Sequence, residues 1–131
     1  MIYFDSSALV KQVRAEAESI ALREWLVDQG AVIGVTSTVA RVEVVRAVAA
    51  GGQQAIARAR AVLAELAQLQ LTSGLLDSAA DLTAPPRSLG AIHLASALRL
   101  GAGLRWFVAY DKRLLDAAEA VGLPIVAPGA S

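Results

Sequence analysis

Short apolar runs alternate with longer amphipathic stretches along this chain. Runs of consecutive apolar residues bounded by polar or turn residues are typical of buried strands. They cover residues 2–4, 31–35, 105–110 and 124–128, with 69–72 as a further short candidate. Apolar residues at helical spacing predict helices over residues 8–13, 16–30, 36–52, 53–70, 75–82, 88–100 and 112–122.

This alternation of strands and helices predicts parallel strands joined by right-handed crossovers. The expected fold class is α/β, with one three-layer domain over residues 1–131 in which helices flank a short parallel sheet. Hydroxyls at Ser6, Ser7 and Ser88 are candidate helix caps. A break at Pro85-Pro86 precedes the helix that starts near Ser88.

The amino-acid composition limits the kinds of segment and of metal site that the chain can form. The chain is 56% hydrophobic, but no apolar run approaches the roughly 18 residues of a membrane span. We therefore expect no membrane segment, and we expect no signal peptide because no basic segment precedes an apolar one. Cysteine is absent and His93 is the single histidine, which excludes disulfides, thiolate catalysis and Cys/His zinc sites. A metal would need oxygen ligands, which favours Mg²⁺ or Mn²⁺.

Two predicted strands end on an aspartate, Asp5 and Asp111. Either residue alone is equally well interpreted as a helix N-cap, which stabilises a helix by about 1 kcal/mol. Together they point to a site, because ligands of open α/β sheets bind beyond the carboxyl ends of the strands. The formal net charge of zero is mild evidence against a nucleic-acid binder.

Glu43 is the most informative acid. At helical spacing it shares an apolar face with Val39, Ala40 and Ala47. A carboxylate on such a face is unfavourable unless it is paired or bound to a metal. An ion pair with Arg46 is the alternative explanation, but the burial argument favours a functional role.

Three residues of the C-terminal half carry weaker signals. Asp116 is a further candidate acid, although an acid in an early helical turn also favours the helix dipole. His93 is more often a packed helix histidine than a ligand. Gly90 stands in a first helical turn, where glycine costs roughly 0.5–1 kcal/mol relative to alanine.

Four segments, "MIYFDSSALVK", "TSTVARVEVVRA", "RSLGAIHLASAL" and "FVAYDKRLLDAA", resemble the conserved blocks of PIN-domain ribonucleases. The closer resemblance is to VapC-type toxins of type II toxin–antitoxin pairs. It covers essentially the whole chain and implies a PIN-like fold.

The resemblance implies a site in which a cluster of acids holds Mg²⁺ or Mn²⁺ and cleaves RNA. Its catalytic and metal-binding acids match Asp5, Glu43 and Asp111, and Asp116 matches an acid that some members carry. The third family acid normally precedes "AIHLA", and Gly90 occupies that position here. Ser6 and Ser7 are supporting candidates that either bond an acid or an ion-bound water, or simply cap the helix.

The resulting prediction is a cytoplasmic, Mg²⁺- or Mn²⁺-dependent endoribonuclease toxin whose activity is impaired by Gly90. The alternative is a catalytically dead PIN-fold module that engages an antitoxin or RNA. The resemblance implies a cognate antitoxin, and a homodimer is also expected. Wide Ala/Leu/Ile stripes on the helices at 16–28 and 53–70 offer surfaces for both, unless they face the sheet.

Two further interpretations explain less. A phosphotransferase with Asp5 as nucleophile usually needs a second aspartate two residues later and a nearby lysine. Here Ser7 takes that position, and the only lysines are Lys11 and Lys112. A purely structural α/β domain with capping aspartates leaves Glu43 unexplained.

Overall fold

The computed structural model describes residues 1–83 and 87–130, so the predicted break at Pro85-Pro86 lies outside the described residues. Its centre is a five-stranded, wholly parallel sheet with strand order β3-β2-β1-β4-β5. The strands are β1 (Ile2–Phe4), β2 (Gly34–Ser37), β3 (Ala67–Leu69), β4 (Trp106–Val108) and β5 (Ile125–Val126). The predicted α/β class is confirmed.

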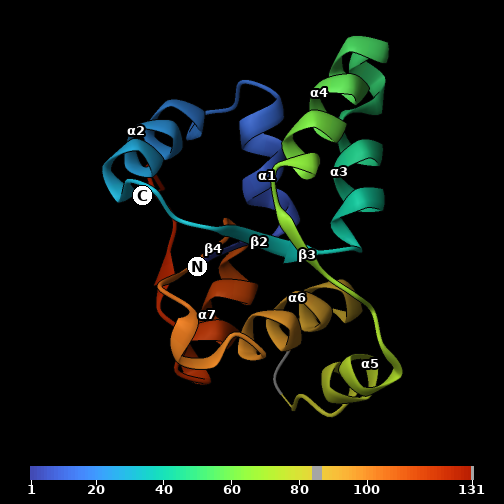
Figure 1. The fold of residues 1–131 in the computed structure, drawn as a ribbon, viewed down its shortest axis with the longest axis vertical. Coiled ribbons are helices and arrows are strands. Elements are labelled where there is room, and N and C mark those ends of the chain that lie inside the picture. Colours follow the sequence, from blue (N-terminus) through green and yellow to red (C-terminus); the bar gives the residue numbers. More distant parts are fainter. Residues whose placement is uncertain (84–86, 131) are drawn as a thin grey trace.

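Within the described residues, seven α-helices flank the sheet in two layers. They are α1 (Ser6–Val13), α2 (Ser19–Gln29), α3 (Ala40–Val48), α4 (Gln53–Ala64), α5 (Ser73–Ala80), α6 (Ser88–Leu98) and α7 (Lys112–Ala120). Helices α1 to α4 lie on one side of the sheet, and α5 to α7 lie on the other (Figure 1). The crossovers between parallel strands place helices on both faces, as the alternating sequence pattern predicts.

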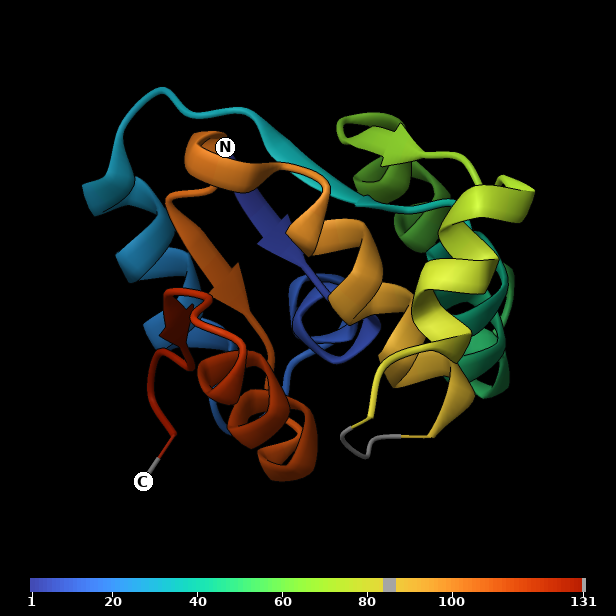
Figure 2. The same cartoon turned by 90° about the horizontal axis from the view of Figure 1, so that it is seen from below.

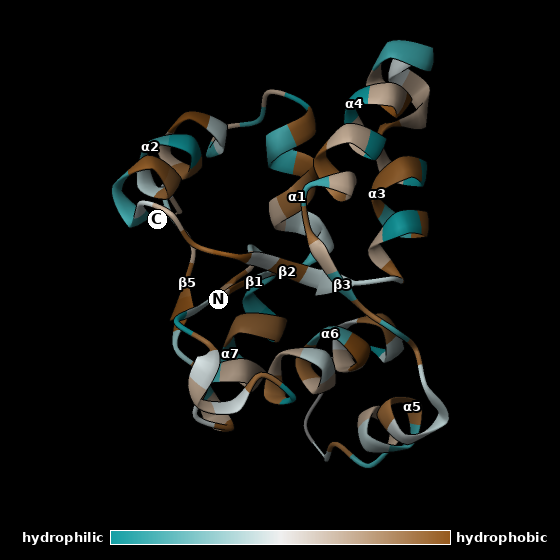
Figure 3. Ribbon diagram, viewed as in Figure 1, coloured by the Kyte–Doolittle hydropathy of each residue, from teal (hydrophilic) through white to brown (hydrophobic). Residues whose placement is uncertain are grey.

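Strand β1 is central and divides its side chains between the two layers. Ile2 and Phe4 pack into the core beneath α1 to α4, whereas Tyr3 packs with Phe107 beneath α6 and α7. This alternation follows from the two-residue period of a strand. Brown, hydrophobic residues accordingly recur in the strands and in the helices around them (Figure 3). Strands β1 and β4 run in the same direction, so their carboxyl ends share one edge (Figure 2).

Several local expectations were wrong. The helix predicted over residues 53–70 ends at Ala64 and is followed by β3 from Ala67, and Ser88 is the first residue of α6, after the N-cap Arg87. Helix α1 is capped by the carboxylate of Asp5, while Ser6 and Ser7 are already helical. The second strand begins at Gly34 and runs through Thr36, which the sequence pattern assigned to the following helix. Thr36 is buried in the sheet because its hydroxyl can donate to the Phe4 carbonyl at 2.8 Å, and its β-branched side chain suits a strand.

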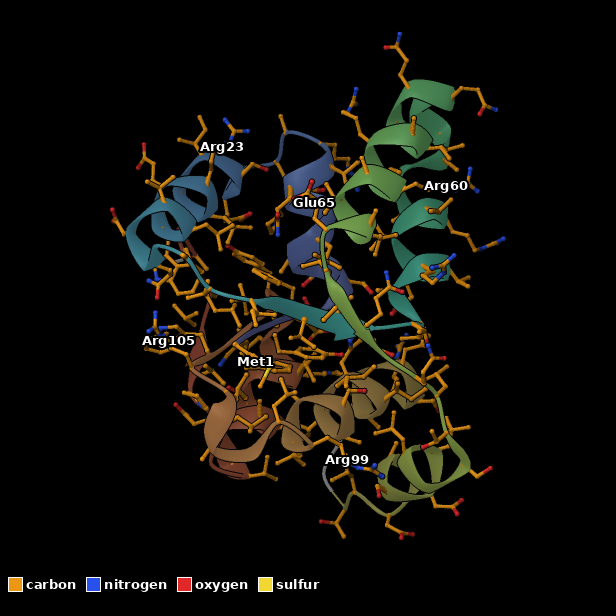
Figure 4. The ribbon with its side chains drawn as sticks, viewed as in Figure 1. Met1, Arg23, Arg60, Glu65, Arg99 and Arg105 are labelled. Carbon is orange, nitrogen blue, oxygen red and sulfur yellow. The ribbon has the colours of Figure 1, made fainter. Side chains whose placement is uncertain are left out.

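Charged side chains populate the periphery. Arg23, Arg60 and Arg105 lie on the outside of the molecule in Figure 4. The apolar stripe of α4 is covered, since Ala55, Ala59 and Leu63 are buried. Helix α2 instead leaves Ile20 and Val27 exposed by 67% and 75%. No helix within the described residues has the length and apolar character needed to cross a membrane.

Candidate active site

A cleft of about 990 Å³ opens beyond the carboxyl ends of β1 and β4, where α1, α6 and α7 begin. Asp5, Glu43 and Asp111 line it, together with Gly90 and His93. Segments far apart in the sequence thus bring the three predicted acids to one cavity. This is the place where parallel α/β sheets bind ligands, because strand ends and helix starts meet there.

Asp116 does not line this cleft. Its side chain is 64% exposed and forms an ion pair with Lys112 at 3.4 Å, one helical turn away. A pair this exposed contributes little to stability. The structure therefore places this residue as a surface acid of α7, apart from the other three.

Asp5 is the most buried acid of the cleft, with 4% exposure. Its Oδ1 accepts hydrogen bonds from the Ala8 amide at 2.9 Å and from the Ser7 hydroxyl at 2.7 Å. Burial raises the pKa of Asp5, and these hydrogen bonds offset only part of the rise. The carboxylate is thus held in a position where its charge is unfavourable.

Ser7 joins two of the acid-bearing segments. Its hydroxyl donates to Asp5 and accepts from the Tyr110 amide at 3.0 Å, one residue before Asp111. The sequence left open whether Ser6 and Ser7 cap a helix or bond acids. The structure shows that both bond acids, because Ser6 donates to Glu43 at 2.7 Å.

Glu43 reaches the cleft from the first turn of α3. Its Oε1 accepts from Ser6 and lies 2.8 Å from Nε2 of His93, so these residues replace Arg46 as its partners. Burial tends to raise the pKa of Glu43, but the hydrogen bonds from His93 and from the Ser6 hydroxyl outweigh it and lower that pKa. The apolar helix face that first singled out Glu43 is therefore compensated by polar partners from α1 and α6.

His93 is the site residue whose importance sequence reasoning underestimated. It is 2% exposed, and its Nδ1 lies 2.7 Å from the hydroxyl of Tyr3. The available signal was its spacing: it follows Gly90 by three residues, so both lie on the same helical face. That face lines the cleft.

The three acids share one pattern of hydrogen bonding. Asp111 caps α7 through Oδ1, which accepts from the Arg113 amide at 2.8 Å and from the Leu114 amide at 3.3 Å. In each acid all protein donors converge on a single oxygen, Oδ1 or Oε1. Across residues 1–83 and 87–130 the second carboxylate oxygen accepts no hydrogen bond from the protein. Three carboxylates are thus fixed by one oxygen and available through the other.

This donor set suits a hard divalent cation in kind, since Mg²⁺ and Mn²⁺ prefer carboxylate oxygens. It falls short in number. In the described part of the chain, no three Asp, Glu or His side chains are grouped closely enough to hold one ion. Gly90, which has no side chain to supply a ligand, lines the same cavity.

Comparison with known proteins decides the family. The PIN domain family model matches residues 2–120. The chain belongs to the PIN-domain family. It is 43% identical to ribonuclease VapC35 of Mycobacterium tuberculosis over 98% of both chains. Ribonuclease VapC46 of the same organism is also 43% identical, over 97% of both chains. Ribonuclease VapC47 is 43% identical over 99% of this chain and 98% of its own length. This PIN-domain protein is therefore homologous to VapC ribonucleases.

A solved structure supports the fold independently. The crystal structure of VapC20 from Mycobacterium tuberculosis, a toxin that cleaves the sarcin-ricin loop, superposes with a TM-score of 0.77. The match covers 98% of this chain and 100% of VapC20 at 18% identity, so it establishes the shared PIN fold. PIN-domain nucleases generally use Mg²⁺.

Proposed function

We propose that this protein is a Mg²⁺- or Mn²⁺-dependent endoribonuclease toxin of the VapC type, weakened by Gly90. The observation that carries the proposal is the shared pattern of Asp5, Glu43 and Asp111, each fixed through one oxygen and open through the other. These acids would hold the ion partly through water molecules, because they are not grouped closely enough in the described residues to hold it directly. A divalent ion would neutralise charge on the phosphodiester in the transition state and activate water for attack.

The chain's own residues would orient the acids and the substrate. Ser7 and the Ala8 amide hold Asp5, while the amides at the start of α7 hold Asp111. Arg87, Lys112 and Arg113 also line the cleft. Although the whole chain is neutral, these cations would contact RNA phosphates beside the acids. Single-stranded or looped RNA is the expected substrate because its phosphates and bases are accessible.

We propose that Gly90 occupies the position at which the family normally has its third acid, so that this acid is missing here. Losing one ligand leaves the ion with fewer protein oxygens, and even the loss of an outer hydrogen-bond partner typically lowers metal affinity or activity about 10–100-fold. The absence of a grouped set of three ligands in the described residues favours a second candidate, a PIN-fold module that binds an antitoxin or RNA without cleaving it.

One experiment separates the two functions. The purified chain and its Asp111→Asn variant, in which asparagine keeps the helix cap, are incubated with labelled looped RNA in Mn²⁺ or in EDTA. The ribonuclease proposal expects slow, Mn²⁺-dependent fragments that Asp111→Asn abolishes. RNA or antitoxin binding without fragments, equal in both proteins, would instead support the binding module.

The partners follow from the same proposal. We infer a cognate antitoxin, a homodimer and a cytoplasmic location. The exposed Ile20 and Val27 of α2 support a protein contact on that helix, whereas the covered stripe of α4 is no longer available for one. Light scattering of the chain alone and with the product of the adjacent reading frame tests both associations. A strict monomer that forms no complex would contradict them.

A further inference from the structure

Both ring nitrogens of His93 are engaged by protein groups. Nε2 faces Glu43 Oε1 at 2.8 Å and Ser6 Oγ at 3.2 Å, while Nδ1 faces the Tyr3 hydroxyl at 2.7 Å. The ring is 2% exposed. A histidine with no free nitrogen is unsuited to bind an ion or to exchange protons with a substrate. His93 nevertheless lines the cleft, so a role other than ion binding or proton transfer must explain its position.

The hydrogen-bond partners determine where the ring hydrogen lies. A carboxylate oxygen only accepts, so the contact with Glu43 requires a hydrogen on Nε2. Ser6 donates its own hydrogen to Glu43, so its contact with Nε2 also needs that hydrogen. Nδ1 of the neutral ring is then an acceptor for the Tyr3 hydroxyl, which is protonated at neutral pH and whose pKa is raised further by burial. The hydrogen bonds therefore run in one direction: the Tyr3 hydroxyl donates to Nδ1 of His93, and Nε2–H of His93 donates to Oε1 of Glu43.

The two ends of this chain differ in freedom. Tyr3 is fully buried in the central strand, with its ring stacked on Phe107 at a centroid distance of 5.5 Å. Glu43 lies at the edge of the cleft with 22% of its side chain exposed. The rigid sheet therefore positions the ring, and the ring positions a carboxylate that would otherwise have several rotamers.

We propose that His93 is a positioning residue for the ribonuclease site: its Nε2–H, directed by the Tyr3 hydroxyl, orients Glu43 so that Oε2 faces the cleft. This inference rests on the proposed function for its effect on cleavage. The hydrogen-bond arrangement itself is testable without any activity.

The activity-independent test uses the fact that His93 is the only histidine. Nitrogen NMR of the ¹⁵N-labelled chain in EDTA near neutral pH gives one imidazole spin system, free of assignment ambiguity. We expect a hydrogen on Nε2 and none on Nδ1. We expect Tyr3→Phe to shift the Nδ1 resonance, because it removes the donor to that nitrogen, while Glu43 keeps the hydrogen on Nε2. An Nδ1–H tautomer would overturn the proposal. A doubly protonated ring would overturn the role given to Tyr3.

The functional test compares two amides in the Gly90→Asp background. Glutamine places its amide near the position of Nε2, whereas the shorter asparagine reaches only the position of Nδ1. We expect His93→Asn to lower kcat about 10–100-fold with little change in KM, and His93→Gln to recover most of that loss. Thermal melts confirm that both variants are folded at the assay temperature.

The outcomes distinguish the two proposals. Equal kcat values in His93→Asn, His93→Gln and their parent would overturn the positioning role while leaving the ribonuclease intact. No Mn²⁺-dependent cleavage by the Gly90→Asp parent would overturn the proposed function instead. In that case the NMR tautomer still decides whether His93 orients Glu43.

Discussion

Helix α1 carries a cluster of charge at each end, and the two clusters are built in opposite ways. At its C-terminal end, Lys11 contacts Glu16 at 3.1 Å and Glu18 at 2.7 Å and lies over the Tyr110 ring at 4.6 Å, while Arg14 contacts Glu16 at 3.0 Å. We call this group the α1 clasp. At the N-terminal end, the Asp5 carboxylate is held by a hydroxyl and an amide.

The pKa values of the acids record this difference. Burial raises the pKa of Asp5. Partial burial also tends to raise the pKa of Glu16, but hydrogen bonds from Lys11 and Arg14 outweigh it and lower that pKa, and the Lys11 hydrogen bond lowers the pKa of Glu18. Acids that meet cations stabilise the fold, whereas an acid held by neutral groups keeps an unfavourable charge. Such a charge is expected where a site must attract a cation.

The largest expected effect comes from adding the missing acid. Gly90→Asp should raise Mn²⁺-dependent RNA cleavage by at least about 10–100-fold, because it restores a carboxylate to the cleft. The change should also add Mn²⁺-dependent thermal stability by mass action. Cleavage rates and melting curves with and without Mn²⁺ measure both effects.

Gly74→Asp is the matched control for that change. Gly74 lies in the first turn of α5, and a Cβ there would make an ordinary contact with the Arg99 guanidinium at 3.7 Å. Both variants lose a helical glycine and place an acid near a helix N-terminus, so both should gain some stability. If Gly74→Asp raised cleavage as much as Gly90→Asp, position 90 would have no special place in the site.

The next effect separates function from stability at Asp5. In the Gly90→Asp background, Asp5→Asn should lower cleavage by about 10–100-fold, yet leave the metal-free protein equally or more stable. Asparagine caps helices as well as aspartate does, and it removes the buried charge. Asp28→Asn, at an exposed position of α2, should change neither. A strongly destabilised Asp5→Asn protein in EDTA would show that Asp5 serves the fold.

Much of this arrangement was predictable from the sequence. Asp5 and Asp111 follow apolar strands, and the parallel topology inferred from the alternating pattern brings strand ends together. Glu43 was found because a carboxylate on an apolar helical face needs a partner. These signals are local or follow from topology, so a single sequence contains them.

The partners of the acids were not predictable in the same way. The bond from Ser6 to Glu43 and the bond from Tyr3 to His93 link residues 37 and 90 positions apart. They depend on the distance between α1, α3 and α6 across the sheet, which periodicity does not give. The N-cap was misassigned for a related reason: Asp5, Ser6 and Ser7 are all good caps, and only the sheet register selects Asp5.

A smaller effect is expected at the clasp. Lys11→Met keeps the apolar stem but removes the ammonium from the Tyr110 ring and from Glu16, and should lower the free energy of unfolding by about 1 kcal/mol. RNA cleavage should not change, because Lys11 does not line the cleft. Urea unfolding measures the loss. Lys112→Met, whose 88% exposed side chain forms one long ion pair, should change stability by less than about 0.5 kcal/mol.

The smallest effect is a difference in how stability depends on pH. A lowered pKa, as in Glu16 and Glu18, adds stability that is complete above the ordinary glutamate pKa of about 4.3 and is lost as the pH falls through the lowered value. The raised pKa of Asp5 acts with the opposite sign, because stability is lost as the pH rises from about 3.9 through the raised value.

In EDTA at fixed ionic strength, Lys11→Met should therefore flatten the acid side of the stability curve, and Asp5→Asn should remove the decline at higher pH. Urea unfolding from about pH 3 to 8 measures both slopes. Parallel curves for the parent and Asp5→Asn would mean that the Asp5 charge is not held at the expense of stability, and the contrast between the two ends of α1 would not hold.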